Sequence, residues 1–151
     1  MSTLLADTSF FVAYLNPRED CHTLAVEWMT ASSERIVTSG WVLAELGNFL
    51  AEGPNRRLLG PLVRALSAEE RVEIVPADHP SFLGALNLYV RRRDKSRSFT
   101  DCTSFCLMKA RKITDALTTD HHFEQAGFTV LLRWRLRRPR SGKDHETRVR
   151  R

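Results

Sequence analysis

Residues 98–102 read Ser-Phe-Thr-Asp-Cys, and the helix that they open, expected over residues 100–112, organises the rest of the chain. Ser98 stands three residues before Asp101, which is the spacing of a capping box at a helix N-terminus. The second position of that motif is usually Glu or Gln, so Asp101 is a variant of the pattern. Two interpretations follow: Asp101 is only a helix cap, or it is a carboxylate placed for chemistry at the start of a core helix.

Two further aspartates stand where expected strands end. Asp7 closes the short apolar run of residues 3–6, and Asp120 follows the strand expected over residues 113–119. Taken alone, Asp120 would also be interpreted as an N-cap of the short helix after it. If both strands belong to one parallel sheet, however, their carboxyl ends lie at the same edge and bring the two side chains together.

Glu45 occupies a position where the helix expected over residues 41–51 calls for a hydrophobic side chain. One helical face, with the spacing i, i+3, i+4 and i+7, is formed by Val42, Glu45, Leu46 and Phe49. An unpaired carboxylate buried on that face would cost several kcal/mol, on the order of the desolvation penalty of a buried ion. Two explanations stay open, namely an ion pair with Arg56, Arg57 or Arg64, and a bound cation.

Strand and helix patterns alternate along the chain as they do in an open α/β sheet. Short apolar or β-branched runs are expected as strands at residues 3–6, 35–38, 72–75, 113–119 and 128–132. The intervals carry helical periodicity. The sequence therefore predicts a three-layer α/β/α fold with a central parallel sheet of about five strands. Because folds of this class bind ligands beyond the carboxyl ends of their strands, we expect the four acids to meet in one pocket.

The helix expected from Ser81 ends in three consecutive arginines, Arg91, Arg92 and Arg93. Its large apolar side chains are expected to face the core, and they are Phe82, Leu83, Leu86 and Tyr89 or Val90. Three cations in a last helical turn suit the helix dipole, which is one explanation for them. Contact with the phosphates of a substrate is the other.

The basic character of the chain is concentrated at its end. Its 151 residues are 42% hydrophobic, as expected for one ordinary globular domain, and its formal charge is +5. Residues 133–151 hold nine Lys or Arg against two acids, a net charge of +7, which leaves −2 for residues 1–132. We expect a domain over residues 1–132 and a disordered or loosely docked basic tail over residues 133–151. The tail suits a polyanion or serves only as a solubilising extension.

The start of the chain and its cysteines indicate a cytoplasmic protein without a membrane segment. No basic leader precedes the first apolar run, and Asp7 interrupts that run too early for a signal peptide or a membrane span. Three cysteines without a disulfide-framework spacing fit a reducing compartment. Cys102 and Cys106 share a helical face and are expected in the core.

Four carboxylates at close quarters repel one another, and their pKa values rise unless a divalent cation holds them ionised. Oxygen ligands of this kind select Mg²⁺ or Mn²⁺. Such ions can activate a water and stabilise the leaving oxygen of a phosphodiester without a His or Ser nucleophile. His121 and His122, beside Asp120, are accordingly interpreted as exposed helix positions, and contact with the substrate is the other explanation for them. The sequence contains no P-loop, no glycine-rich dinucleotide fingerprint and no Gly-x-Ser-x-Gly motif.

Four stretches of the chain resemble, in order and spacing, those of the PIN-domain ribonucleases, and most closely the VapC-type toxins of bacterial toxin–antitoxin pairs. They are Leu5-Ala6-Asp7-Thr8-Ser9, Leu43-Ala44-Glu45-Leu46, Ser98-Phe99-Thr100-Asp101-Cys102 and Ala116-Leu117-Thr118-Thr119-Asp120-His121-His122-Phe123. The resemblance covers residues 1–132. It implies a central parallel sheet, Mg²⁺ or Mn²⁺ dependence, cleavage of RNA, a homodimer and inhibition by a cognate antitoxin. The long basic tail departs from the family pattern.

Carried onto this chain, the resemblance assigns catalysis and metal binding to Asp7, Glu45, Asp101 and Asp120. Thr8 and Thr119 are expected to hold water or phosphate near that site, and Arg91, Arg92 and Arg93 to contact substrate phosphates. The predicted function is that of a metal-dependent endoribonuclease. One alternative is a PIN-like module that binds RNA or protein without cutting. The other, a phospho-accepting receiver-like domain, needs a pair of adjacent acids after the first strand, and Asp7-Thr8 lacks the second acid.

Overall fold

The computed structural model describes residues 2–93 and 96–133, so most of the predicted basic tail lies outside the described residues. A five-stranded parallel sheet forms the middle layer, in the order β3-β2-β1-β4-β5. Its strands are β1 (Thr3–Ala6), β2 (Arg35–Ser39), β3 (Val72–Val75), β4 (Asp115–Leu117) and β5 (Thr129–Val130). The predicted sheet is therefore confirmed, although β4 and β5 are shorter than expected.

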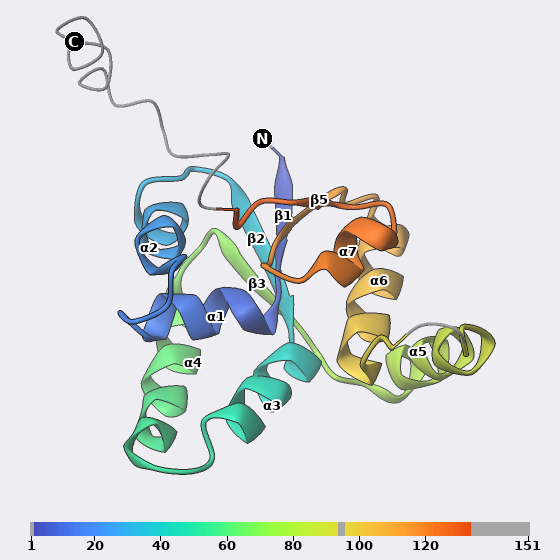
Figure 1. Ribbon diagram of the computed structural model, residues 1–151, viewed down its shortest axis with the longest axis horizontal. Coiled ribbons are helices and arrows are strands. Elements are labelled where there is room, and N and C mark those ends of the chain that lie inside the picture. The colour runs from blue at the N-terminus through green and yellow to red at the C-terminus, as the bar shows by residue number, and fades with distance from the viewer. Residues whose placement is uncertain (1, 94–95, 134–151) are drawn as a thin grey trace, which may run out of the picture.

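Helices cover both faces of this sheet (Figure 1). In chain order they are α1 (Thr8–Leu15), α2 (His22–Thr30), α3 (Gly40–Phe49), the 3₁₀ helix η1 (Pro54–Leu58), α4 (Leu59–Ala68), α5 (His79–Arg91), α6 (Phe99–Arg111) and α7 (His121–Gln125). In Figure 1, α1 to α4 lie on one side of the sheet, and α5, α6 and α7 lie on the other. This is the predicted three-layer α/β/α architecture.

Adjacent residues of the central strand β1 enter two separate cores. Leu4 packs into the cluster that α1 to α4 share with one face of the sheet, whereas Leu5 packs with Phe105 and Met108 of α6 on the opposite face. Both side chains are at most 1% exposed. A strand buried on both faces reads as a continuous apolar run, which is why β1 was recognisable in the sequence.

The predicted inward face of α5 is wrong. Phe82, Leu83, Leu86, Tyr89 and Val90 are 36–49% exposed, and the buried residue of the helix is Ala85. The reason is that α5 lies at the outside of its layer and packs against α6 instead of the sheet (Figure 1). The rings of Phe82 and Tyr89 contact Phe99 at 5.2 and 5.8 Å between centroids, so the aromatic side chains stay near the surface.

Within the described residues, no helix is long and apolar enough to cross a membrane. Cys102 is buried on α6, as the sequence predicted, whereas Cys106 is only half-buried, and both are free thiols. Burial raises the pKa of each thiol, so neither is a reactive thiolate.

Candidate active site

The four predicted acids line one cleft of about 1010 Å³ at the carboxyl edge of the sheet. Asp7 follows β1 and is the N-cap residue of α1, and Asp120 is the N-cap residue of α7. Asp101 lies in the first turn of α6, and Glu45 lies in the middle of α3. The fold therefore brings together carboxylates separated by up to 113 positions in the sequence, as the parallel-sheet argument predicted.

Asp7 is a buried carboxylate that is only half satisfied. Its Oδ2 accepts hydrogen bonds from Thr118 Oγ1 at 3.0 Å and Ser9 Oγ at 3.4 Å. Its Oδ1 is shielded from solvent and makes no hydrogen bond to a described residue. Burial raises the pKa of Asp7 to about 7, against the opposing effect of the nearby Thr8 amide, and the charge of Asp101 raises it further. Asp7 is thus a carboxylate that needs a cation or a proton.

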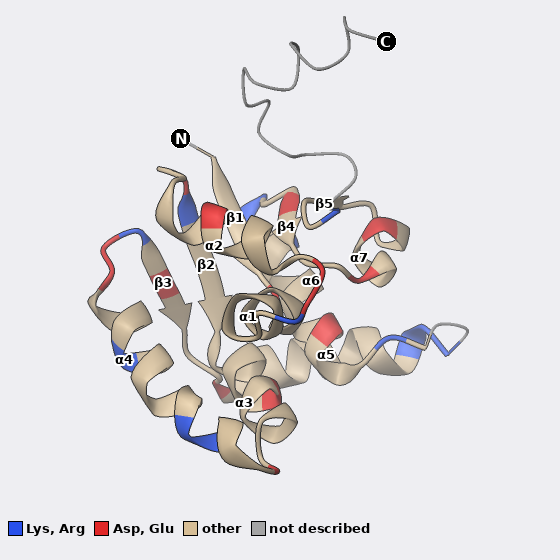
Figure 2. Cartoon of the chain, turned by 60° about the vertical axis from the view of Figure 1, so that its left-hand side comes forward, with Lys and Arg blue, Asp and Glu red and all other residues tan. Residues whose placement is uncertain are grey.

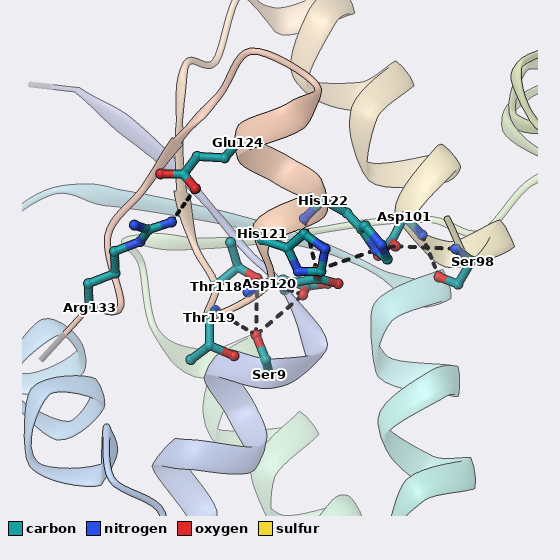
Figure 3. Close-up of polar contacts among 11 residues, drawn as sticks. Ser9, Ser98, Asp101, Thr118, Thr119, Asp120, His121, His122, Glu124 and Arg133 are labelled. Atoms are coloured by element: carbon teal, nitrogen blue, oxygen red, sulfur yellow. Dashed lines mark hydrogen bonds and ion pairs between the residues drawn. The ribbon is translucent and has the colours of Figure 1, made fainter. Parts of the chain in front are cut away.

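Asp101 is held rigidly by the capping box that the sequence predicted. Ser98 Oγ accepts from the Asp101 amide at 3.0 Å, and Asp101 Oδ2 accepts from the Ser98 amide at 3.2 Å (Figure 3). Burial raises the pKa of Asp101, and the charge of Asp120 adds to the shift. Asp101 is therefore both a helix cap and a member of the acidic cluster.

His122 lies between two of the acids, which the sequence argument missed. Its Nδ1 lies 3.3 Å from Asp120 Oδ1 and 3.4 Å from Asp101 Oδ2, although neither contact has the geometry of a hydrogen bond (Figure 3). Its amide donates to Asp120 Oδ1 at 2.9 Å. The expectation of an exposed position holds for His121, which is 67% exposed, and fails for His122, which is 18% exposed. The missed signal is the cap itself, since a residue two positions after an N-cap Asp stays close to its carboxylate.

Glu45 is half-buried and faces the cleft instead of the core. The flanking members of its predicted stripe, Val42 and Leu46, are fully buried, but Phe49 is 64% exposed and lines the cleft beside Glu45. The predicted stripe is therefore only partly in the core: Val42 and Leu46 face the core, whereas Glu45 and Phe49 face the cleft. Glu45 forms no ion pair with the arginines of the described chain, and its charge raises the pKa of both Asp7 and Asp101.

Hydroxyl groups fill the space between β1 and the end of β4. Thr118 is fully buried, accepts from the Asp120 amide at 3.0 Å, and lies 3.0 Å from Ser9 Oγ. Ser9 Oγ in turn accepts from the Thr119 amide at 3.0 Å (Figure 3). Both predicted threonines line the cleft: Thr119 is exposed there, and the buried Thr8 Oγ1 has no partner among the described residues. Sequence reasoning did not single out Thr118, which joins the two strand ends.

The three predicted arginines do not reach the acidic cleft. Arg91 is exposed and donates to the Asn87 carbonyl, while Arg92 and Arg93 line a second pocket of about 570 Å³. Figure 2 shows this basic segment at the end of α5, apart from the acids around α1, α3 and α7.

The cleft itself carries strong negative charge. Beyond the four predicted acids it is lined by Glu19 and Asp20 from the loop before α2. The one cation among the described lining residues is Arg133, and it forms an ion pair with Glu124 (Figure 3). A cleft with this balance attracts cations and repels bare nucleic acid.

The donor set fits a hard divalent cation. It consists of carboxylate oxygens with a buried, unpaired Asp7 Oδ1 among them, and oxygen is the ligand that Mg²⁺ and Mn²⁺ prefer. Possible ligand atoms of Asp120, His121 and His122 also lie within 4.8 Å of one another. Imidazole nitrogen suits softer ions better, so the oxygen set is the better match to magnesium.

Comparison with known proteins agrees with this arrangement. The family model described as the PIN domain matches residues 4–129, which include all four acids. The chain belongs to the PIN-domain family. The resemblance noted from the sequence is thereby confirmed for the family as a whole.

This PIN domain is similar to the Mycobacterium tuberculosis protein named 23S rRNA-specific endonuclease VapC20. The two are 32% identical over 127 residues, which cover 83% of this chain and 95% of VapC20. A crystal structure of VapC20, described as a Sarcin-Ricin loop cleaving toxin, superposes with a TM-score of 0.75 at 26% identity, covering 85% of this chain and 98% of that one.

More distant structures share the fold of this PIN domain. FitAcB from Neisseria gonorrhoeae matches with a TM-score of 0.62 at 23% identity and covers 88% of this chain and 99% of its own. VapBC2 from Rickettsia felis matches with a TM-score of 0.60 at 17% identity, with coverage of 85% and 97%. At these sequence identities, the structural similarity supports a shared fold and nothing more.

Proposed function

We propose that this protein is an endoribonuclease, the toxin of a toxin–antitoxin pair, and that it depends on Mg²⁺ or Mn²⁺. The observation that carries the proposal is the convergence of Asp7, Glu45, Asp101 and Asp120 in one cleft, with the buried Asp7 Oδ1 unpaired. The likeness to VapC20, an endonuclease by its name, supports the choice of RNA as substrate. A role as a PIN-like module that binds without cutting is the alternative outcome of the test below.

The metal would be held by the carboxylates of Asp7, Glu45, Asp101 and Asp120. When bound, Mg²⁺ or Mn²⁺ supplies a water of lowered pKa and polarises the phosphoryl oxygen of a phosphodiester. It also explains why four acids can share one cleft, because a divalent charge keeps them ionised despite burial and mutual repulsion.

The chain's own contribution is to orient these carboxylates before substrate arrives. Thr118 and Ser9 hold one oxygen of Asp7 and leave the other free. The capping box fixes Asp101, and the His122 amide fixes Asp120. Because these oxygens are already positioned, little reorganisation is needed during the reaction. Thr8 and Thr119 line the same cleft and would bind water or a substrate phosphate there.

Partners follow from the same family membership. We propose an RNA substrate, a cognate antitoxin that blocks the acidic cleft, and a homodimer, in a protein of the cytoplasm. VapC20 carries 23S rRNA in its name, so ribosomal RNA is the first substrate class to assay. For the domain organisation, we propose a nuclease domain over residues 1–132 followed by a basic tail over residues 133–151.

Cleavage of RNA by the full-length protein tests the activity. We expect cleavage in the presence of Mg²⁺ or Mn²⁺, none in EDTA, and loss of activity to the EDTA background in Asp101→Asn. Asp115→Asn is the matched control, because Asp115 is a half-buried acid at the start of β4 that does not line the cleft.

These assays of wild type and of the two variants separate the proposals. If wild type binds RNA but does not cut it with either metal, the protein is a binding module and the nuclease proposal is wrong. If cleavage persists in EDTA, metal dependence is wrong although the nuclease stands. If Asp101→Asn cuts RNA as fast as Asp115→Asn, the acidic cleft is not the active site.

A further inference from the structure

Arg97 is a buried guanidinium without a carboxylate partner in the described part of the chain. The residue is 8% exposed, and its Nε and Nη2 are shielded from solvent and make no hydrogen bond. Its guanidinium carbon lies 5.1 Å from the centroid of the Phe105 ring. This cation–π contact offsets part of the burial of charge, but an aromatic face gives the N–H groups at the edge no acceptor. Arg97 therefore lacks an anion.

The surroundings of Arg97 form a basic pocket of about 570 Å³. Its lining residues are Tyr89, Val90, Arg92, Arg93, Ser96, Arg97 and Cys102. Every charged residue that the structure describes in this lining is an arginine. Residues 94 and 95 lie outside the described ranges. Arg92 and Arg93 are exposed at the wall of the pocket. A buried arginine beside two exposed ones at a pocket wall is suited to an oxyanion.

The basic pocket adjoins the acidic cleft. Ser96 lines both, and Ser98, which caps the helix of Asp101, lines the cleft on the other side of Arg97. An RNA backbone that enters the acidic cleft therefore passes the basic pocket, because the two share Ser96 at their border. The cleft alone repels such a chain, so the pocket supplies attraction where the electrostatic field of the domain is otherwise unfavourable.

We propose that Arg97, with Arg92 and Arg93, binds a backbone phosphate of the RNA at a nucleotide flanking the one that is cut. The assignment of a phosphate rests on the pocket, and the assignment to RNA rests on the proposed function. Arg97 acts on binding: it holds the substrate beside the cleft and does not touch the reacting atoms. Its loss should raise the KM and leave kcat nearly unchanged.

RNA binding at varied salt tests the pocket in the full-length protein. The probe is a fluorescently labelled single-stranded RNA, titrated in EDTA so that it is not cut. Arg97→Met keeps the packing over Phe105 and removes the charge, and we expect its RNA affinity to fall about tenfold or more. The slope of log affinity against log salt should become less negative by about 0.7, the value for one phosphate of a single strand.

Arg57→Gln is the matched control, because it removes one exposed arginine from η1, between α3 and α4, and Arg57 lines neither the pocket nor the cleft. Its slope should equal that of wild type. The double variant Arg92→Gln/Arg93→Gln changes only exposed side chains, so it tests the pocket even if Arg97→Met does not fold. The proposal is overturned if the folded variants of the pocket change affinity and slope no more than Arg57→Gln does.

Inorganic phosphate separates this proposal from the nuclease proposal. At equal ionic strength, phosphate should raise the Tm of wild type above that in chloride by more than it raises the Tm of the pocket variants, since exclusion of phosphate from the surface stabilises proteins without a site as well. Wild type whose increment exceeds that of the pocket variants, but which does not cut RNA, would retain the phosphate pocket and refute the nuclease. Wild type that cuts RNA while the pocket variants match it in KM and salt slope would retain the nuclease and refute the pocket.

Discussion

Asp7 and Thr118, which are 111 positions apart in the sequence, are joined by a 3.0 Å hydrogen bond in which the Thr118 hydroxyl donates to Asp7 Oδ2. The contact links the carboxyl end of β1 to that of β4. It lowers the pKa of a carboxyl group whose burial raises it. The geometry of the acidic cleft therefore depends on a neutral residue as well as on the acids.

Replacing Thr118 with valine should weaken both the fold and the activity at low pH. The variant removes the nearer of the two hydroxyl donors to Asp7 Oδ2 and the acceptor of the Asp120 amide, and a buried group left unsatisfied costs about 1–3 kcal/mol. The pKa of Asp7 rises further, so the acidic limb of the pH–rate profile moves to higher pH. Thr118→Ser keeps the hydroxyl and should stay near wild type. Identical profiles for Val and Ser would contradict this role.

The metal-free protein should lose stability as the pH rises. Folded Asp7 keeps its proton up to a pH of about 7, whereas the unfolded chain releases it near 3.8. The folded state thus binds more protons between these values, and the free energy of unfolding falls with increasing pH, by on the order of 4 kcal/mol in total. Urea unfolding in EDTA from pH 4 to pH 8 measures this.

Asp7→Asn removes the titrating group, so its stability should fall less across that range and exceed that of wild type at pH 8. Adding Mg²⁺ at pH 8 should stabilise wild type more than the variant, because the variant lacks one anionic ligand. If the free energy of unfolding of the two proteins in EDTA falls equally with pH, Asp7 does not cause the pH dependence of stability.

Removal of the imidazole between Asp101 and Asp120 should move the acidic limb of the pH–rate profile of RNA cleavage to higher pH. His122 lowers the pKa of Asp101, and His122→Ala removes that effect, so Asp101 stays protonated to higher pH. The loss of rate should be largest at acidic pH and small in alkaline buffer. His79→Ala, which changes an exposed histidine on α5, is the control. A uniform loss of rate at every pH would assign His122 another role.

Deletion of residues 134–151 should leave a folded nuclease domain. Leu131 and Leu132 are at most 2% exposed, and Arg133 pairs with Glu124, so the described domain ends at this point. The deletion removes a net charge of +6. We expect weaker RNA binding and a smaller salt slope, with cleavage retained at saturating RNA. An unchanged salt slope would mean that the tail contributes nothing to binding.

Local patterns were sufficient for most of the architecture. The apolar run before Asp7 and the Ser98–Asp101 spacing depend on contacts between neighbours in the chain, and both were interpreted correctly. The convergence of four acids followed from one topological rule about parallel strands. The predicted inward face of α5 is one expectation that failed, because periodicity shows that a helix has an apolar side and not how much of that side another element covers.

Residue type and spacing in this chain therefore determine its strands, its caps and the identity of its acids, since these arise from backbone sterics and short-range hydrogen bonds. The position of His122 between two carboxylates, the bond from Thr118 to Asp7, and the burial of Arg97 without an acid depend on the packing of distant segments. Burial raises the pKa of Asp7 and leaves N–H groups of Arg97 without an acceptor among the described residues. Burial is a property of the assembled fold alone.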